Sequence, residues 1–304
     1  MRIERDVPLG PLTTYRVGGP ARWFAAVEDE GGLRAVAAHV QEHGCDVLVI
    51  GKGSNLLVAD DGFDGIAVQL GDRFADVDID GTTVVAGGAA PMPVVARRSA
   101  SAGLAGLEWM VGVPGSIGGG VRMNAGGHGS DLASALLRVR LFDLATGDDG
   151  VVAAASLHLG YRTSSVRPTQ VIVHAELAAD RGDAERSAAT IAEIVRWRRD
   201  NQPGGQNAGS VFTNPPGDSA GRLIDAAGCK GLRIGTAEVS TKHANFIQAD
   251  PGGLAADVRA LMVEVQRRVR EESGVELHAE NVLVGFDPRS EVEGSGGEGG
   301  RPAR

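Results

Sequence analysis

The sequence is poor in sulfur and aromatic side chains. Aromatic residues make up 4% of the 304 residues, and only two cysteines occur, Cys45 and Cys229. Neither cysteine lies in a C-x-x-C pair or a histidine-rich cluster, so no metal site is expected. Two free thiols are typical of a protein that stays in a reducing compartment.

Long hydrophobic runs and an excess of positive charge are also missing. No run approaches the roughly 20 apolar residues that cross a bilayer, and the N-terminal segment lacks the apolar core of a signal peptide. A net charge of −9 at pH 7 argues against a general nucleic-acid surface. We therefore expect a cytoplasmic protein without membrane or nucleic-acid partners. Local Arg and Lys residues can still form a cleft for a small anion.

The order of the expected elements indicates an α+β protein. A strand (22–29), a helix (31–44) and a second strand (46–51) form a βαβ-like start. Short strands rich in Val, Ile and Leu dominate from 65 to 179, with one helix at 92–103. These patterns place a first unit at residues 1–70 and a second at 71–182.

Residues 183–286 are expected to form a third unit. The amphipathic pattern predicts a helix over 183–202, which Pro203 stops. Its predicted buried face holds Ala189, Ile191, Ile194 and Val195. Further helices are predicted at 220–228 and 252–274, followed by a strand pair or one bent strand at 275–286. The tail 287–304 is rich in Gly, Ser and Glu and is predicted to be disordered, because it cannot bury apolar surface.

Glycine is abundant, at 45 residues, and two loops concentrate it. The first, GKGSNLLV (51–58), follows an apolar strand. Its bare glycines would let backbone N–H groups approach an anion, and Ser54 and Asn55 add donors, a composition typical of a phosphate cradle. The spacing does not match a Walker A loop. An ordinary surface turn is the alternative interpretation.

The second loop, VGVPGSIGGGVRMNAGGHG (111–129), holds eight glycines in nineteen residues. This density disfavours a helix, and GSIGGG does not match the Rossmann fingerprint G-x-G-x-x-G. We expect a long bare segment, with the Asn124 amide, that could lie along a large flat anionic ligand. A convoluted glycine-rich turn is the alternative. Two such loops suit a ligand with a pyrophosphate and a long body, such as FAD.

Seven motifs in order make the sequence specific. They are PLGPLTTYRVGGPARW (8–23), GKGSNLLV (51–58), GVPGSIGGGVRMNAGGHG (112–129), GYRTS (160–164), AGSVFTNP (208–215), KHANFI (242–247) and LHAENVLVG (277–285). The set resembles the UDP-N-acetylenolpyruvoylglucosamine reductase family over residues 6–286. The resemblance implies an FAD-binding fold of the vanillyl-alcohol oxidase type, with two subdomains (1–70 and 71–182). A C-terminal α+β substrate-binding domain (183–286) would follow, whose last strand returns to the active site. The chain is similar to the shorter, second type, which lacks the segment with a substrate-capping tyrosine.

The resemblance also implies a reaction. NADPH would reduce non-covalently bound FAD, which would reduce UDP-N-acetylglucosamine enolpyruvate to UDP-N-acetylmuramate for peptidoglycan synthesis in a monomeric enzyme. Such chemistry needs a cation on the substrate carboxylate and a proton donor at the α-carbon. The motifs assign Arg162 as the carboxylate clamp, Ser210 as the proton donor, and Glu280 as an acid that burial keeps protonated. By themselves, a structural arginine, a turn serine and an exposed strand glutamate are the alternatives.

The binding residues are also carried over from the motifs. The cofactor-binding predictions are Tyr15, Arg16, Gly18, Gly51, Lys52, Gly53, Ser54, Asn55, Leu56, Gly112, Pro114, Gly115, Ser116, Gly118, Gly119, Asn124, Ala125 and Gly126. The substrate-binding predictions are Asn214, Arg222, Lys242 and Asn245. Four positions depart from the family pattern, namely His128 for Tyr, Thr213 for Lys, Ala279 for Pro and Asn281 for Val. Lys242 or Arg233 is expected to compensate for the missing charge at Thr213.

Two other functions stay open at this point. An oxidase or dehydrogenase could use the same FAD scaffold on another substrate. A non-catalytic flavin or nucleotide-sugar binding protein is the second, although the three expected catalytic residue types are all present.

Overall fold

A computed structural model describes residues 2–287, so the predicted tail lies outside the described residues apart from Asp287. The first unit is a four-stranded sheet in the order β1-β2-β5-β3. Strands β2, β5 and β3 run parallel, and β1 pairs with β2 in the antiparallel sense. The elements are β1 (Ile3–Pro8), β2 (Pro20–Val27), α1 (Glu30–His43), β3 (Asp46–Ile50) and β5 (Phe63–Leu70). The predicted βαβ start is confirmed.

The second unit is a five-stranded sheet in the order β12-β11-β13-β7-β6, antiparallel throughout. Its strands are β6 (Val77–Asp80), β7 (Thr83–Gly87), β11 (Leu136–Asp143), β12 (Asp149–Ala153) and β13 (Gln170–Ala178). Helix α2 (Met92–Ser101) packs in the same hydrophobic core. The short pairs are β8 (Leu104–Ala105) with β14 (Asp180–Arg181), and β9 (Gly126–Gly127) with β10 (Ser130–Asp131).

One expectation for the second glycine loop is wrong. Its centre forms helix α3 (Ile117–Met123), in which Ser116 is the N-cap and Asn124 ends the helix at φ +39°. The glycines serve close packing, because a Cβ on Gly118 would lie 3.1 Å from the Gly88 carbonyl oxygen. Tertiary contact of this kind outweighs the low helix propensity of glycine.

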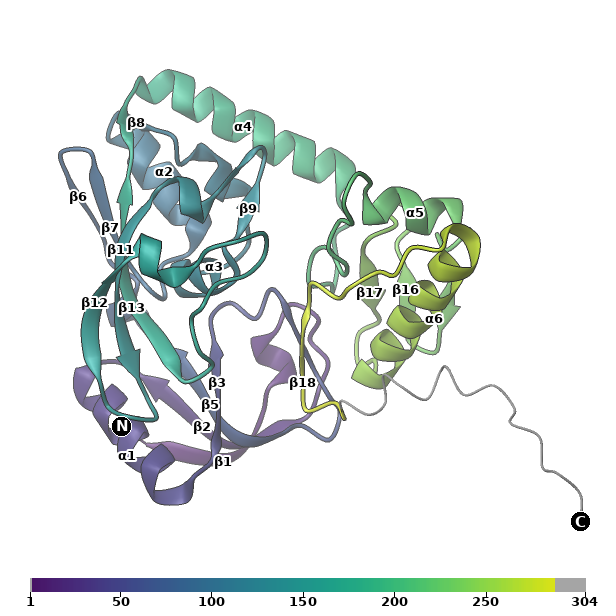
Figure 1. Cartoon of the computed structure of the whole chain (residues 1–304), viewed down its shortest axis with the longest axis horizontal. Helices are drawn as coiled ribbons and strands as arrows, with labels where there is room; N and C mark the ends of the chain where they lie inside the picture. Colours follow the sequence, from purple (N-terminus) through teal and green to yellow (C-terminus); the bar gives the residue numbers. More distant parts are fainter. Residues whose placement is uncertain (1, 288–304) are drawn as a thin grey trace, which may run out of the picture.

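Helix α4 (Ala184–Asn201) bridges the second unit and the rest of the chain (Figure 1). Its buried residues are Ser187, Ile191 and Ile194, and the last two belong to the core of the second unit. Val195 is 42% exposed, so the predicted face was wrong at this position and at Ala189, which is also exposed. The helix predicted to open the third unit therefore packs on the second.

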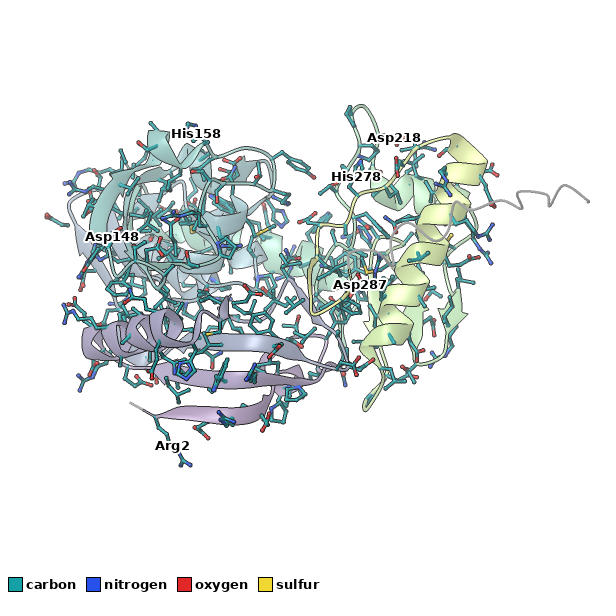
Figure 2. All side chains as sticks on the ribbon, turned by 60° about the horizontal axis from the view of Figure 1, so that its bottom comes forward. Arg2, Asp148, His158, Asp218, His278 and Asp287 are labelled. Carbon is teal, nitrogen blue, oxygen red and sulfur yellow. The ribbon has the colours of Figure 1, made fainter. Side chains whose placement is uncertain are left out.

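The third unit is a lobe set apart from the two sheets (Figure 2). It contains α5 (Ala220–Ala226), β15 (Arg233–Ile234), β16 (Ala237–Val239), β17 (Ile247–Ala249) and α6 (Ala255–Ser273). Of the predicted strand region 275–286, only β18 (Val282–Val284) is regular. It pairs in parallel with β4 (Leu56–Val58) of the first unit, so the end of the chain returns to the first glycine loop.

Five short 3-10 helices complete the described residues: Gly10–Leu12, Asp72–Phe74, Glu108–Gly112, Leu132–Ser134 and Ala154–Leu157. No helix within residues 2–287 is long and apolar enough to cross a membrane.

Candidate functional site

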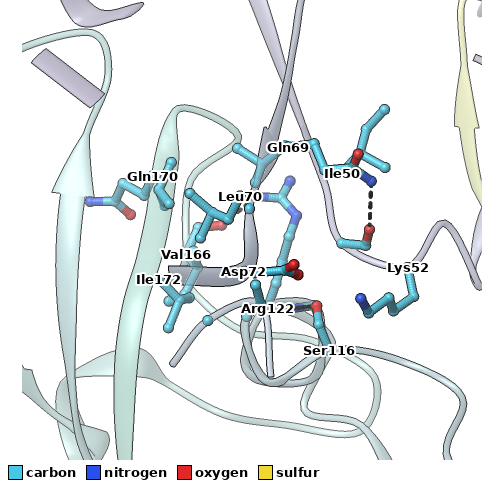
Figure 3. Close-up of a pocket in the computed structure, with 18 of the residues that line it drawn as sticks. Ile50, Lys52, Gln69, Leu70, Asp72, Ser116, Arg122, Val166, Gln170 and Ile172 are labelled. Atoms are coloured by element: carbon cyan, nitrogen blue, oxygen red, sulfur yellow. Dashed lines mark hydrogen bonds between the residues drawn. The ribbon is translucent and has the colours of Figure 1, made fainter. Parts of the chain in front are cut away.

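The two glycine loops meet at one wall of a cavity of about 260 Å³. A Cβ on Gly51 would lie 2.4 Å from Ser116 Oγ, so a larger residue at position 51 would displace the Ser116 hydroxyl. Five of the predicted cofactor-binding residues line the cavity (Figure 3): Gly51, Lys52, Ser116, Gly118 and Gly119. Strand ends of both sheets also line the cavity, including Gln69, whose Nε2 donates to Gly51 O at 3.3 Å. The cavity thus lies between the first and second units.

Two cations line this cavity without a carboxylate partner. Lys52 and Arg122 are in no ion pair with the residues that the structure describes. Burial lowers the pKa of Arg122, because few polar groups replace its lost water. Among residues 2–287, the one hydrogen bond of the Arg122 guanidinium runs from Nη1 to the Val166 carbonyl, at 3.4 Å. Glu28 and Asp72 line the same cavity, so the fit to a diphosphate group rests on the bare main chain of the glycine loops together with the two unpaired cations.

Much of the cavity lining escaped the sequence interpretation. The residues missed are Glu28, Val49, Ile50, Gln69, Leu70, Gly71, Asp72, Gly88, Ala89, Arg122, Val166, Gln170, Val171 and Ile172. Arg122 carried a usable signal, since it follows Gly118 by four residues and lies on the same helix face once 117–123 is a helix. The strand residues carried none, because their approach to the loops depends on how the two sheets meet.

Several predicted cofactor residues support the loops instead of lining the cavity. Tyr15 is fully buried among apolar residues that include side chains of the third unit. Gly18 (φ +112°) lies against Val58, and Gly53 (φ +60°) lies against the backbone of Leu12. Arg16 is exposed at φ +54°. These residues fix the path of the first glycine loop.

Asn124 also has a different place from the one expected. It is 2% exposed, so its amide does not face an open surface. Its Nδ2 donates to Asp131 Oδ2 at 3.1 Å and to Gly160 O at 2.9 Å, and its Oδ1 accepts from Ala133 N at 2.9 Å. Asn124 therefore holds the backbone two residues before Arg162.

The other predicted residues in the glycine stretches are not among the residues that line the cavity. Gly115 lies near Ser54, since a Cβ on it would be 3.6 Å from Ser54 Oγ. A Cβ on Gly112 would lie 2.8 Å from the His128 ring. Pro114, Leu56 and Ala125 offer no polar side chain, and Gly126 O accepts a hydrogen bond from Arg162 Nη2 at 3.0 Å.

The three predicted catalytic residues lie in one region. Arg162 Nε donates to Glu280 Oε1 at 2.7 Å, and both side chains are mostly buried. The Glu280 N–H donates to Val211 O at 2.7 Å, which places the segment of Glu280 beside the residue after Ser210. Residues more than a hundred positions apart in the chain thus meet where the second and third units face each other.

Burial raises the pKa of Glu280, and the neighbouring Arg162 opposes this rise without cancelling it. A carboxyl group whose pKa is raised by burial can serve as an acid, although the guanidinium beside it favours the ionised form. Arg162 itself is held at φ +56°. Its strained backbone and its bond to Gly126 O fix the direction of the guanidinium.

The predicted substrate-binding residues are engaged within the protein. Asn214 Oδ1 caps helix α5 by accepting from Ala220 N at 3.0 Å. Arg222 is paired with Asp218 on the surface, and Lys242 Nζ donates to Arg199 O at 2.6 Å. Asn245 is buried, with both amide atoms bonded to the backbone of Phe212. Asn245 therefore has a structural role here, and a direct substrate contact of its side chain is at odds with this arrangement.

The departures from the family pattern are explained in part. His128 packs edge-on against Trp197 of α4, with ring centroids 5.2 Å apart. Thr213 bonds through N and Oγ1 to His278 O. The expected substitute Arg233, on β15, is paired with Glu238 of β16 and with Asp250, which follows β17. Lys242 Nζ is hydrogen-bonded to Arg199 O. Neither supplies a free cation at Thr213.

Comparison with known proteins agrees with this architecture. Residues 21–150 match the family described as "FAD binding domain", and residues 201–284 match "UDP-N-acetylenolpyruvoylglucosamine reductase, C-terminal domain". The fold and site thus define an α+β flavin-binding protein with an added C-terminal domain, and the expected fold class is confirmed. The chain belongs to the UDP-N-acetylenolpyruvoylglucosamine reductase family.

The similarity spans nearly the whole chain. The UDP-N-acetylenolpyruvoylglucosamine reductase of Acidiphilium cryptum is 44% identical over 95% of this chain and 93% of its own. That of Paramagnetospirillum magneticum is 42% identical over 94% and 92%, respectively. A crystal structure of the Thermus caldophilus reductase superposes with a TM-score of 0.82 at 37% identity, covering 93% of this chain and 99% of that one.

Proposed function

We propose that this protein reduces UDP-N-acetylglucosamine enolpyruvate to UDP-N-acetylmuramate, with FAD as its non-covalent cofactor and NADPH as hydride donor. The names of its relatives support this reaction. The observation that carries it is the convergence of Arg162 and Glu280, 2.7 Å apart, on the segment of Ser210. We further propose that the enzyme works as a cytoplasmic monomer in peptidoglycan precursor synthesis.

The cavity residues would hold the diphosphate of FAD. Lys52 and Arg122 offset its charge, and the glycines of both loops let main chain approach it closely. Bound in this cavity, FAD would supply hydride transfer from NADPH to the enolpyruvyl double bond. The residues of the protein itself bind the substrate carboxylate and supply the proton to the α-carbon.

Arg162 binds the carboxylate of the enolpyruvyl group and stabilises the charge that grows on it. The Ser210 hydroxyl gives its proton to the α-carbon, so the double bond gains one hydride and one proton in total. Glu280, whose pKa is raised by burial, acts in its protonated form and donates a hydrogen bond toward the developing negative charge. The Ser210 oxygen then recovers a proton from solvent.

The test is a reductase assay with the enolpyruvyl UDP-sugar on wild-type protein and on Ser210→Ala. We expect NADPH oxidation that depends on the UDP-sugar in wild type, and a loss of about a hundredfold or more in the variant. Reduction of the bound flavin by NADPH should be unchanged in Ser210→Ala. An unimpaired variant would contradict the proton-donor role.

The same samples separate the other functions. Rapid oxygen consumption without the UDP-sugar would favour an oxidase of the same fold. Purification of a folded protein that binds no flavin would favour a non-catalytic relative.

A further inference from the structure

A buried amide joins the first glycine loop to the segments of Ser210 and Glu280. Asn281 is 4% exposed. Its Nδ2 lies 2.9 Å from Asn55 Oδ1, 3.1 Å from Ala208 O and 3.3 Å from Ser210 O. The three acceptors come from two different units of the fold, so one side chain connects them.

Asn55 also forms hydrogen bonds with the residues on either side of Asn281. Asn55 Nδ2 donates to Glu280 O at 3.0 Å, and Val282 N donates to Asn55 O at 2.9 Å. Asn55 therefore bonds the residues on both sides of Asn281, through its side-chain amide to Glu280 and through its main-chain carbonyl to Val282. The main chain of Glu280 is thereby fixed to the loop that lines the cofactor cavity.

The orientation of the Asn281 amide is also fixed. Tyr15 is fully buried, and its hydroxyl contacts Asn281 Oδ1 at 3.5 Å. A buried donor or acceptor left without a partner costs about 1–3 kcal/mol. In a flipped amide, Oδ1 would face three acceptor oxygens and lose its hydrogen bonds there.

We propose that Asn281 is a positioning residue that sets Ser210 and Glu280 at a fixed place relative to the cofactor loop. The inference rests on the proposed function. A valine at this position would have no group to make these bonds. The oxidative half of the reaction depends on this placement, because proton delivery and hydride arrival must coincide on one double bond. The reductive half, from NADPH to flavin, uses neither Ser210 nor Glu280.

The test compares Asn281→Val and Asn281→Asp with wild type. The Asn281→Val variant has no side-chain group to form these hydrogen bonds. The Asn281→Asp variant keeps the side-chain shape, but its carboxylate oxygen would face the three acceptor oxygens that now surround Nδ2. The flavin is reduced photochemically and mixed anaerobically with the enolpyruvyl UDP-sugar, and the reductive half is measured with NADPH. A misplacement of about 1 Å costs on the order of a hundredfold in rate. We therefore expect flavin reoxidation to slow by about ten- to a hundredfold in both variants, with reduction by NADPH within about twofold of wild type.

The matched control is Gln266→Leu. Gln266 Nε2 donates to Leu277 O at 2.8 Å, so it anchors the same returning segment from helix α6 and not from the cofactor loop. This variant should lose stability while keeping the ratio of the two half-reaction rates. FAD content and thermal unfolding are measured for every variant.

The outcomes separate the inference from the proposed function. Variants that reoxidise as fast as wild type, or that lose both half-reactions together with FAD, overturn the positioning role alone. A wild-type protein that binds FAD and does not reduce the UDP-sugar overturns the proposed function, and the inference falls with it.

Discussion

Glu280 shows how a single residue takes its properties from its surroundings. Burial raises its pKa, and Arg162 lowers it by charge and by a hydrogen bond. Removing the guanidinium in Arg162→Met should therefore raise the pKa of Glu280 further. Carboxyl ¹³C shifts of glutamate-labelled protein measure this directly, with Glu280→Gln to identify the resonance. A lower midpoint in Arg162→Met would contradict the account.

The same residue sets a pH dependence of activity. The protonated acid is the active form, so flavin reoxidation by the UDP-sugar should fall as pH rises through the raised pKa of Glu280. Glu276→Gln is the control, because Glu276 is exposed in the same segment and its variant should keep the wild-type profile. A rate that rises with pH over this range would assign the acid elsewhere.

At the scale of elements, the glycines of helix α3 lower its intrinsic stability but leave its main chain exposed to the cavity. Gly119 lines the cavity, and a Cβ there would meet only Ser116 Oγ at 3.6 Å. Gly119→Ala should stabilise the apoprotein by about 0.5–1 kcal/mol through helix propensity, yet weaken FAD binding by about tenfold because the methyl group enters the cavity. Urea unfolding and fluorescence titration with FAD measure the two effects. Gly127→Ala, whose Cβ has open space, should leave FAD affinity unchanged.

At the scale of the whole molecule, the third unit is tied to the first by more than the β4–β18 pair. Asp60, of the first unit, accepts hydrogen bonds from Ala255 N and Ala256 N at 2.9 Å and so caps the start of α6. Asp60→Ala should cost about 1 kcal/mol and raise the KM for the UDP-sugar more than the Kd for FAD. Hydrogen exchange in the first turn of α6 should speed up. The control is Asp61→Ala at the exposed neighbouring position, which should change neither the KM for the UDP-sugar nor the hydrogen exchange of α6. Equal exchange rates in the two variants would rule out a role of Asp60 in joining the third unit to the first.

Periodicity and turn residues were sufficient to predict most helices and strands, because these depend on neighbours in the chain. Helix α1 and its end at Gly44, at φ +59°, are of this kind. Helix α3 was missed because what permits it, close packing on Gly88 and Met92, is not local. The buried face of α4 was partly wrong because the sequence does not say which unit the helix packs against.

The sequence by itself determined the family, the two glycine loops and the residue types that the chemistry needs, since short motifs carry these. Only the tertiary structure decided which predicted site residues form side-chain hydrogen bonds within the protein, namely Asn124, Asn214, Lys242 and Asn245. It also decided that Arg122 lines the cavity and that Asn281 joins Asn55 to Ser210. A side chain's partners are set by which distant segments come to lie beside it, and that placement follows from packing of the whole chain.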